Sequence, residues 1–153
     1  MSSSTGAAPV AIVTGGAAGI GRAAADAFAR RGAAVVIADL PGAAGAEAAD
    51  ELRAQGHRAL FVPTDVSRPG DAERMVAAAL EAFGRLDWAF NNAGIEGPSA
   101  PLADVAEDDW DRVIAVIAGI SWRMQSQTPF RLTAITRSQS SSATSVRGAD
   151  GPS

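Results

Sequence analysis

Short apolar runs alternate with amphipathic segments along the first three quarters of the chain. Four runs rich in Val, Ile, Leu and Ala predict buried strands, and they cover residues 10–14, 33–38, 58–62 and 86–90. Apolar residues at helical spacing predict helices between and after these runs, at residues 20–31, 43–55, 69–83 and 107–120. Strand and helix therefore follow each other regularly up to about residue 120.

Three of the predicted helices have an apolar stripe. The first two are expected to face the core, and the last, near the end of the alternation, is expected to be left partly uncovered. The stripes consist of Ile20, Ala24, Ala27 and Phe28; of Ala72, Met75, Val76, Ala79, Leu80 and Phe83; and of Trp110, Val113, Ile114 and Ile117. Ser67 stands where it can cap the helix that starts near Pro69.

Apolar strands joined by helices predict an α/β protein with a doubly wound (Rossmann) parallel sheet that helices cover on both faces. Right-handed crossovers place the four strands, numbered along the chain, in the spatial order 3-2-1-4. The sheet is expected to be incomplete, because the alternation stops after the fourth helix.

The character of the chain changes near residue 117. Beyond it the segment is rich in Ser and Thr, contains four arginines and a single acid, Asp150, and shows no sustained period. We therefore expect a flexible N-terminus at 1–9, a partial doubly wound domain at 10–120 and a disordered tail at 121–153. No strand is expected in this tail, so the outer edge of the strand at 86–90 is expected to be unpaired. A shifted reading frame or a truncated gene model would explain the change.

Composition narrows the classes of function. Apolar residues make up 47% of the chain, which is enough for a core, and the net charge of −4 argues against nucleic acid or anionic membranes as partners. The absence of cysteine excludes disulfides and thiolate metal sites, and we expect no metal site. No apolar stretch approaches the roughly 20 residues that span a bilayer, and no signal peptide is recognisable. A cytoplasmic protein is the expectation.

A glycine loop, Thr14 to Gly21 with the sequence TGGAAGIG, directly follows the first predicted strand. A pyrophosphate needs a tight turn, an approachable backbone and a helix N-terminus at such a place. Gly15, Gly19 and Gly21 meet the first two needs, and the helix that starts near Ile20 meets the third. A loop without a ligand is the weaker alternative, because an acid follows at the end of the next strand.

That acid is Asp39, whose carboxylate can accept hydrogen bonds from both ribose hydroxyls of an adenosine, with Leu40 beside it. The same carboxylate would repel a 2′-phosphate, and the chain has no lysine to offset the repulsion. The pattern therefore predicts NAD rather than NADP as the cofactor. An ordinary solvated acid in a loop is the alternative.

These motifs, together with Asp65-Val66 and the sequence Asn91-Asn92-Ala93-Gly94 after the fourth strand, resemble the short-chain dehydrogenase/reductase family over residues 10 to about 116. The resemblance implies an NAD(P)-dependent oxidoreductase acting on a small alcohol or carbonyl. By position it implies that Asp65 and Val66 contact the adenine. Asn92, Ala93 and Gly94 would line the ribose next to the nicotinamide. For Asp65, a role in capping the following helix is the alternative.

The chain departs from the family in its catalytic residues. The family uses an Asn on the helix after the fourth strand, a Ser after the fifth strand, and a Tyr-x-x-x-Lys on the next helix. Here Ile117 stands at the Asn position, and the chain has no Tyr and no Lys. His57 lies at the start of the third strand, too far away to replace them. We therefore expect no catalytic residue, and at most cofactor binding.

Two other functions stay open: a catalytically dead NAD-binding regulatory module, and a non-functional translation product. The resemblance also implies a possible homo-oligomer through the helix near 107–120. The sequence names no substrate.

Overall fold

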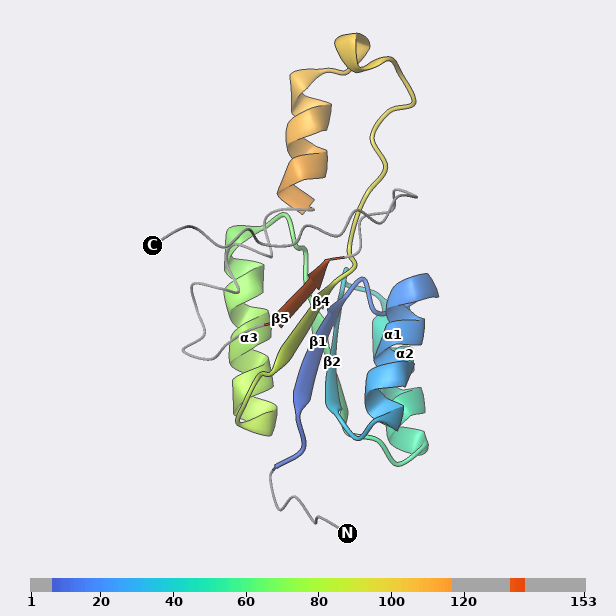
Figure 1. The fold of residues 1–153 in the computed structure, drawn as a ribbon, viewed down its shortest axis with the longest axis vertical. Coiled ribbons are helices and arrows are strands. Elements are labelled where there is room, and N and C mark those ends of the chain that lie inside the picture. The colour runs from blue at the N-terminus through green and yellow to red at the C-terminus, as the bar shows by residue number, and fades with distance from the viewer. Residues whose placement is uncertain (1–6, 117–132, 137–153) are drawn as a thin grey trace, which may run out of the picture.

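The computed structural model describes residues 7–116 and 133–136, and these form one parallel sheet with helices on both faces (Figure 1). Its strands are β1 (Val10–Thr14), β2 (Ala34–Asp39), β3 (Ala59–Pro63), β4 (Trp88–Asn91) and β5 (Thr133–Thr136). They lie side by side in the order β3-β2-β1-β4-β5. The predicted doubly wound sheet with the order 3-2-1-4 is confirmed for its first four strands.

Three helices connect the strands: α1 (Gly19–Arg30), α2 (Ala43–Ala54) and α3 (Pro69–Phe83). Figure 1 shows α3 on one face of the sheet and both α1 and α2 on the other. A short 3₁₀ turn, η1 (Leu102–Asp104), precedes a further helix at residues 107–116. The bounds agree with the predicted ones to within one or two residues, apart from the last helix, which is described only as far as residue 116.

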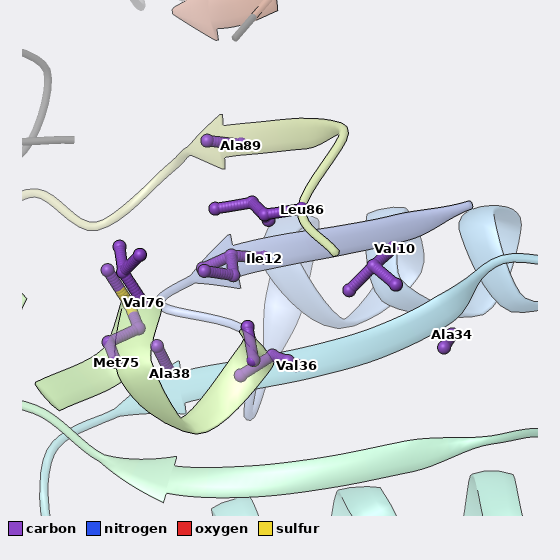
Figure 2. Packing of buried hydrophobic residues seen from close by; sticks show 10 residues of the cluster. Val10, Ile12, Ala34, Val36, Ala38, Met75, Val76, Leu86 and Ala89 are labelled. Atoms are coloured by element: carbon purple, nitrogen blue, oxygen red, sulfur yellow. The ribbon is translucent and has the colours of Figure 1, made fainter. Parts of the chain in front are cut away.

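One face of the sheet packs against α3, as Figure 2 shows. Alternate strand residues point to this face, because successive side chains of a strand lie on opposite sides. The cluster of buried residues consists of Val10, Ile12, Ala34, Val36, Ala38, Met75, Val76, Ala79, Leu86 and Ala89. Leu80 and Phe83 pack against it half-buried, so the predicted apolar stripe of α3 faces the core.

The opposite face packs against α1 and α2 through Val13, Val35 and Ile37. The predicted stripe of α1 is confirmed in part. Ala24 and Phe28 pack half-buried against this part of the core, whereas Ile20 is 48% exposed, Ala27 is exposed, and Ala25 and Ala29 are fully buried instead. The residues that α1 buries fully, Gly21, Ala25 and Ala29, are all small, which lets the helix lie close to the sheet. Figure 1 shows α1 running close along the sheet.

A fifth strand, β5, corrects the expectation that no strand follows residue 117. Thr133–Thr136 pairs in parallel with β4, with Trp88 opposite Thr133 and Asn91 opposite Thr136. The outer edge of β4 therefore has a partner. A four-residue strand is too short for periodicity to reveal, and only its pairing with β4 defines it. The rest of the predicted tail lies outside the described residues.

The helix at residues 107–116 leaves part of its predicted apolar stripe exposed. Trp110 is 50% exposed and Ile114 is 40% exposed, while Val116 is buried. The side that is turned toward the rest of the protein therefore includes Val116, one position away from Ile117, which lies outside the described residues. The exposure of Trp110 and Ile114 agrees with the expectation that this apolar face would be left partly uncovered.

Asp87 ties the start of β1 to the start of β4. Its Oδ2 accepts hydrogen bonds from the Val10 N–H at 2.8 Å and from the Arg85 Nε at 2.8 Å. Arg85 also donates to the carbonyl oxygen of Ala7 at 3.0 Å. Burial acts to raise the pKa of Asp87, but the hydrogen bonds from Arg85 and the Val10 N–H outweigh it, so this pKa is lowered.

This lowered pKa predicts a loss of stability in acid. The unfolded chain holds an Asp pKa of about 3.9, so the folded protein gains stability from Asp87 above that pH. The gain is lost as the pH falls through the lower pKa of the folded state. Asp87→Asn cannot titrate, so its free energy of unfolding is expected to change less between pH 6 and pH 3 than that of the wild type, measured by urea unfolding.

Asp50→Asn provides a matched control, because Asp50 is an exposed carboxylate of α2 that pairs with Arg53. Its difference between the two pH values is expected to match that of the wild type. An Asp87→Asn protein with the full wild-type difference would show that this carboxylate does not link the two strands as described.

Candidate cofactor-binding site

A cavity of about 570 Å³ lies at the carboxyl ends of β1, β2, β3 and β4. Its lining residues are Gly15, Ala38, Asp39, Leu40, Thr64, Asp65, Val66, Ser67, Asn92, Ala93, Gly94, Ile95, Arg112 and Val116. Open parallel sheets bind their ligands at this edge, beside the point where the strand order reverses. Here the strand order reverses between β1 and β4. The volume of the cavity is in the range of typical small-molecule and cofactor sites.

Most of the residues predicted to bind a cofactor meet at this cavity, although they come from four different loops. Eight of the eleven line it, namely Gly15, Asp39, Leu40, Asp65, Val66, Asn92, Ala93 and Gly94. The other three, Gly19, Ile20 and Gly21, are not in its wall and form the first turn of α1. His57 lies at the opposite end of the sheet, just before β3 begins.

Glycine is needed at residues 19 and 21, where the loop after β1 leads into α1, for two different physical reasons. Gly19 has a φ of +55°, and a Cβ there would meet no atom within 4 Å, so its surroundings are open. At Gly21 a Cβ would lie 2.0 Å from the Gly15 carbonyl oxygen and 2.7 Å from the Asn92 Nδ2. Gly21 therefore lets α1 start against the turn, and Gly19 lets the backbone bend where a ligand can approach.

The helix that follows this loop has a free N-terminal end. Ala18 occupies the cap position without a side-chain hydrogen bond, and the first turn of α1 contains no acid. The first N–H groups of a helix have no partners within the helix, and they carry the positive end of its dipole. This end of α1 therefore suits an anionic group next to Gly19.

Thr14 joins the glycine loop to the Asn92-Ala93 segment. Its hydroxyl is buried, accepts the N–H groups of Asn92 and Ala93 at 3.1 Å each, and donates to the carbonyl oxygen of Phe90 at 3.4 Å. The Asn92 side chain donates in turn to the carbonyl oxygen of Gly15 at 3.2 Å. The ends of β1 and β4 are thus fixed relative to each other.

Asp39 lies at the end of β2, beside the glycine loop. Its Oδ2 accepts the N–H of Ala17 at 2.9 Å, and its Oδ1 accepts the N–H of Leu40 at 2.8 Å. Leu40, next to it in the cavity wall, is 62% exposed. The arrangement places a carboxylate and an uncovered apolar surface side by side.

Asp65 forms a turn with the residues that follow it. Its Oδ1 accepts the Ser67 hydroxyl at 2.6 Å and the Ser67 N–H at 3.1 Å, and its Oδ2 pairs with Arg68 at 3.3 Å. The hydrogen bond from the Ser67 hydroxyl is the main cause of a lowered pKa of Asp65. The predicted cap by Ser67 is wrong, because Arg68 holds that position and Ser67 bonds to Asp65.

Asp71 is a polar residue of the site region that sequence reasoning missed. It is 8% exposed in the first turn of α3, and its Oδ2 accepts the N–H of Asp65 at 2.7 Å. It thereby fixes the backbone of the segment that lines the cavity. A buried acid in the first turn of a helix has no sequence signal of its own, because such acids are also common at helix starts for their effect on the dipole.

Arg112 and Val116 also line the cavity and were not predicted. They lie four residues apart on the helix at residues 107–116, so one side of this helix faces the site. Arg112 is the only cation among the described residues of the cavity wall, and its nearest acid is Asp109, at 3.6 Å. Helical spacing alone placed Trp110, Val113 and Ile114 on the important face, and it could not show what the other side meets.

Comparison with known proteins agrees with this geometry. The family model described as short chain dehydrogenase matches residues 9–133. The chain therefore belongs to the short-chain dehydrogenase family. The match extends past residue 116, where the resemblance was expected to stop, and it reaches the start of β5.

Individual relatives support the same assignment. A short chain dehydrogenase/reductase of Aspergillus oryzae is 45% identical over 122 residues, which are 76% of this chain and 47% of that protein. A short chain dehydrogenase/reductase of Burkholderia phymatum, solved with NAD, is similar with a TM-score of 0.71 and 38% identity over 77% of this chain and 42% of its own. A 3-ketoacyl-(acyl-carrier-protein) reductase of Brucella melitensis, complexed with NADH, has the same TM-score and 35% identity over 79% and 49% of the two chains.

The chain spans about half the length of the curated relatives that it matches. The matched part holds the glycine loop and the segment after β4. Of the described residues, no helix is long and apolar enough to cross a membrane.

Proposed function

We propose that this chain binds NAD, as the cofactor-binding part of an NAD-dependent short-chain dehydrogenase that acts on a small alcohol or carbonyl. The observation that carries the proposal is the carboxylate of Asp39, held beside the glycine loop in the wall of the cavity. The family membership and the cofactors of the two solved relatives support it.

The residues present fit such a cofactor. The open backbone at Gly19 and the uncapped start of α1, with Ile20 and Gly21, would hold the pyrophosphate. Asp39 would accept the hydroxyls of the adenosine ribose, and the adenine would lie against Leu40, Asp65 and Val66. The segment from Asn92 to Gly94 would border the nicotinamide half. When bound, NAD supplies the carbon that accepts a hydride from an alcohol.

Charge favours NAD over NADP. Asp39 and Asp65 both line the cavity, and a 2′-phosphate next to Asp39 would bring like charges together. Arg112 is the residue that would oppose this preference, since it lines the same cavity. The positive charge of Arg112 already lies near Asp109. We therefore assign the stronger influence on the choice between NAD and NADP to Asp39, which borders the glycine loop directly.

Calorimetric titration of the purified chain with both cofactors tests the proposal. We expect NAD to bind at least about tenfold more tightly than NADP, which corresponds to roughly 1.4 kcal/mol of repulsion. Equal or tighter binding of NADP would contradict the role of Asp39. The absence of any NAD binding would contradict the proposed function itself.

Arg112→Ala is the control for this titration. If Arg112 contributes little, the ratio of the two affinities stays near that of the wild type. If its loss instead makes the preference for NAD much larger, then Arg112 attracts the 2′-phosphate and the chain is less selective than the position of Asp39 indicates.

The proposal includes no turnover by this chain alone, because it contains no Tyr and no Lys to move the hydroxyl proton. A regulatory NAD-binding module is the second candidate, and the same absence favours it. Incubation with NAD and a panel of alcohols, followed at the absorbance of NADH, is expected to show no reaction.

We further propose a cytoplasmic location, and self-association through the exposed Trp110 and Ile114.

A further inference from the structure

Asp39 connects three segments around the cavity. Its carboxylate accepts the N–H of Ala17, in the glycine loop, and that of Leu40, in the loop after β2. Its carbonyl oxygen accepts the N–H of Thr64, just after β3, at 2.7 Å. One residue at the tip of β2 thus links the ends of β2 and β3 to the loop that follows β1.

The bond to Ala17 matters because the loop has few other constraints. Ala17 lies between two glycines with left-handed backbones, Gly15 at a φ of +64° and Gly19 at +55°. Gly16, Ala17 and Ala18 carry no polar side chain. The start of the loop is held where Asn92 donates to the Gly15 carbonyl oxygen and where the Gly15 N–H donates to Ala38. The middle of the loop is held by the carboxylate of Asp39.

We propose that Asp39 is a positioning residue for the glycine loop, and that it controls binding of the cofactor's pyrophosphate as well as recognition of its ribose. This inference rests on the proposed function, since it concerns the same nucleotide site. A loop already held in its binding conformation loses less conformational freedom when the ligand arrives, so the phosphates bind more tightly.

The proposal has a consequence for cofactor specificity. Removing the carboxyl group of Asp39, as in Asp39→Ala, in order to admit a 2′-phosphate also removes the acceptor of the Ala17 N–H. A change of this residue alone therefore loosens the loop that every such cofactor needs, and NAD and NADP are both expected to bind more weakly.

A ligand without ribose hydroxyls separates the two roles. We would titrate wild type and Asp39→Ala with 2′,3′-dideoxyadenosine 5′-diphosphate, which keeps the adenine and the pyrophosphate. If Asp39 positions the loop, its loss weakens binding of this ligand about tenfold, the effect of losing one hydrogen bond to a charged group. If Asp39 only contacts ribose hydroxyls, the affinity stays the same or rises, since a negative charge has been removed, and this would overturn the proposal.

Asp50→Ala is the matched control, because it also removes one carboxylate, from the exposed surface of α2. Its affinity for the dideoxy ligand is expected to equal that of the wild type. A loss in this variant as large as in Asp39→Ala would overturn the proposal, because the effect would then not depend on the hydrogen bond to Ala17.

Hydrogen exchange at the Ala17 amide provides a measurement that needs no ligand. Asp39→Ala is expected to raise the exchange rate of this amide about tenfold, and Asp39→Asn, which keeps one acceptor oxygen, to raise it less. If Asp39→Ala does not fold, the comparison of wild type with Asp39→Asn carries both measurements. Unchanged exchange at Ala17 together with unchanged affinity in Asp39→Asn would then overturn the proposal.

The two hypotheses fail in different ways. Wild-type protein that binds neither NAD nor the dideoxy ligand overturns the proposed function, and this inference with it. The positioning role alone is overturned if the wild-type protein binds NAD and the dideoxy ligand, and if Asp39→Ala binds the dideoxy ligand as tightly as the wild type does.

Discussion

Gly21→Ala is expected to abolish measurable NAD binding and to destabilise the fold by about 1–3 kcal/mol, the usual cost of forcing an extra carbon into a packed site. The new Cβ would lie 2.0 Å from the carbonyl oxygen of Gly15, so the start of α1 must move away from the turn. That movement displaces the N-terminal groups of the helix from the place of the pyrophosphate. Titration with NAD and a thermal melt measure the two effects.

Gly70→Ala is the matched control for this substitution. Gly70 lies in the first turn of α3, where a Cβ would meet no atom within 4 Å. Alanine favours a helix over glycine by up to about 1 kcal/mol, so this variant is expected to be as stable as the wild type or slightly more so. If Gly21→Ala binds NAD with wild-type affinity, the close contact between α1 and the turn is not needed for the site.

Thr14→Val is expected to destabilise the protein by about 2–4 kcal/mol and to weaken NAD binding. Valine has nearly the shape of threonine but no hydroxyl. The N–H groups of Asn92 and Ala93 would both lose the acceptor that Thr14 provides at 3.1 Å. Buried donors without partners are costly, and the segment after β4 would no longer be fixed to the glycine loop. Urea unfolding and NAD titration check the prediction.

Thr14→Ser separates the hydroxyl from the methyl group. Serine keeps the acceptor and loses one buried methyl, which costs about 1 kcal/mol. The serine variant is therefore expected to be more stable than the valine variant, although valine is the more apolar residue. The reverse order would mean that packing, and not the hydrogen bonds to Asn92 and Ala93, fixes the ends of β1 and β4.

Local patterns in the sequence were sufficient to predict much of the site. The apolar runs predicted β1 to β4, and the glycine loop and Asp39 followed from the turn after a buried strand. Eight of the eleven predicted cofactor residues line one cavity, because the carboxyl ends of parallel strands meet at one edge of the sheet. Their roles in binding stay predictions until a cofactor is titrated.

The errors occurred where a residue's role depends on a distant segment. Periodicity assigned Ile20 and Ala27 to the buried side of α1 together with Ala24 and Phe28, but only the last two pack against the core, and Ala25 and Ala29 are the residues that are fully buried. Ser67 was expected to cap α3 and bonds to Asp65. Each of these outcomes depends on which neighbour is within reach, and the sequence does not contain that information locally.

The sequence by itself determined the alternation of strands and helices, the order of the first four strands in the sheet, and the glycine loop with Gly15, Gly19 and Gly21. These features follow from the period of apolar residues and from the backbone freedom of glycine, which act within a few residues. Only the tertiary structure decided that Thr133–Thr136 pairs with β4, that Arg112 and Val116 face the cavity, and that Asp39 holds Ala17. Such contacts join segments that lie far apart in the chain, and they exist only once folding has brought those segments together.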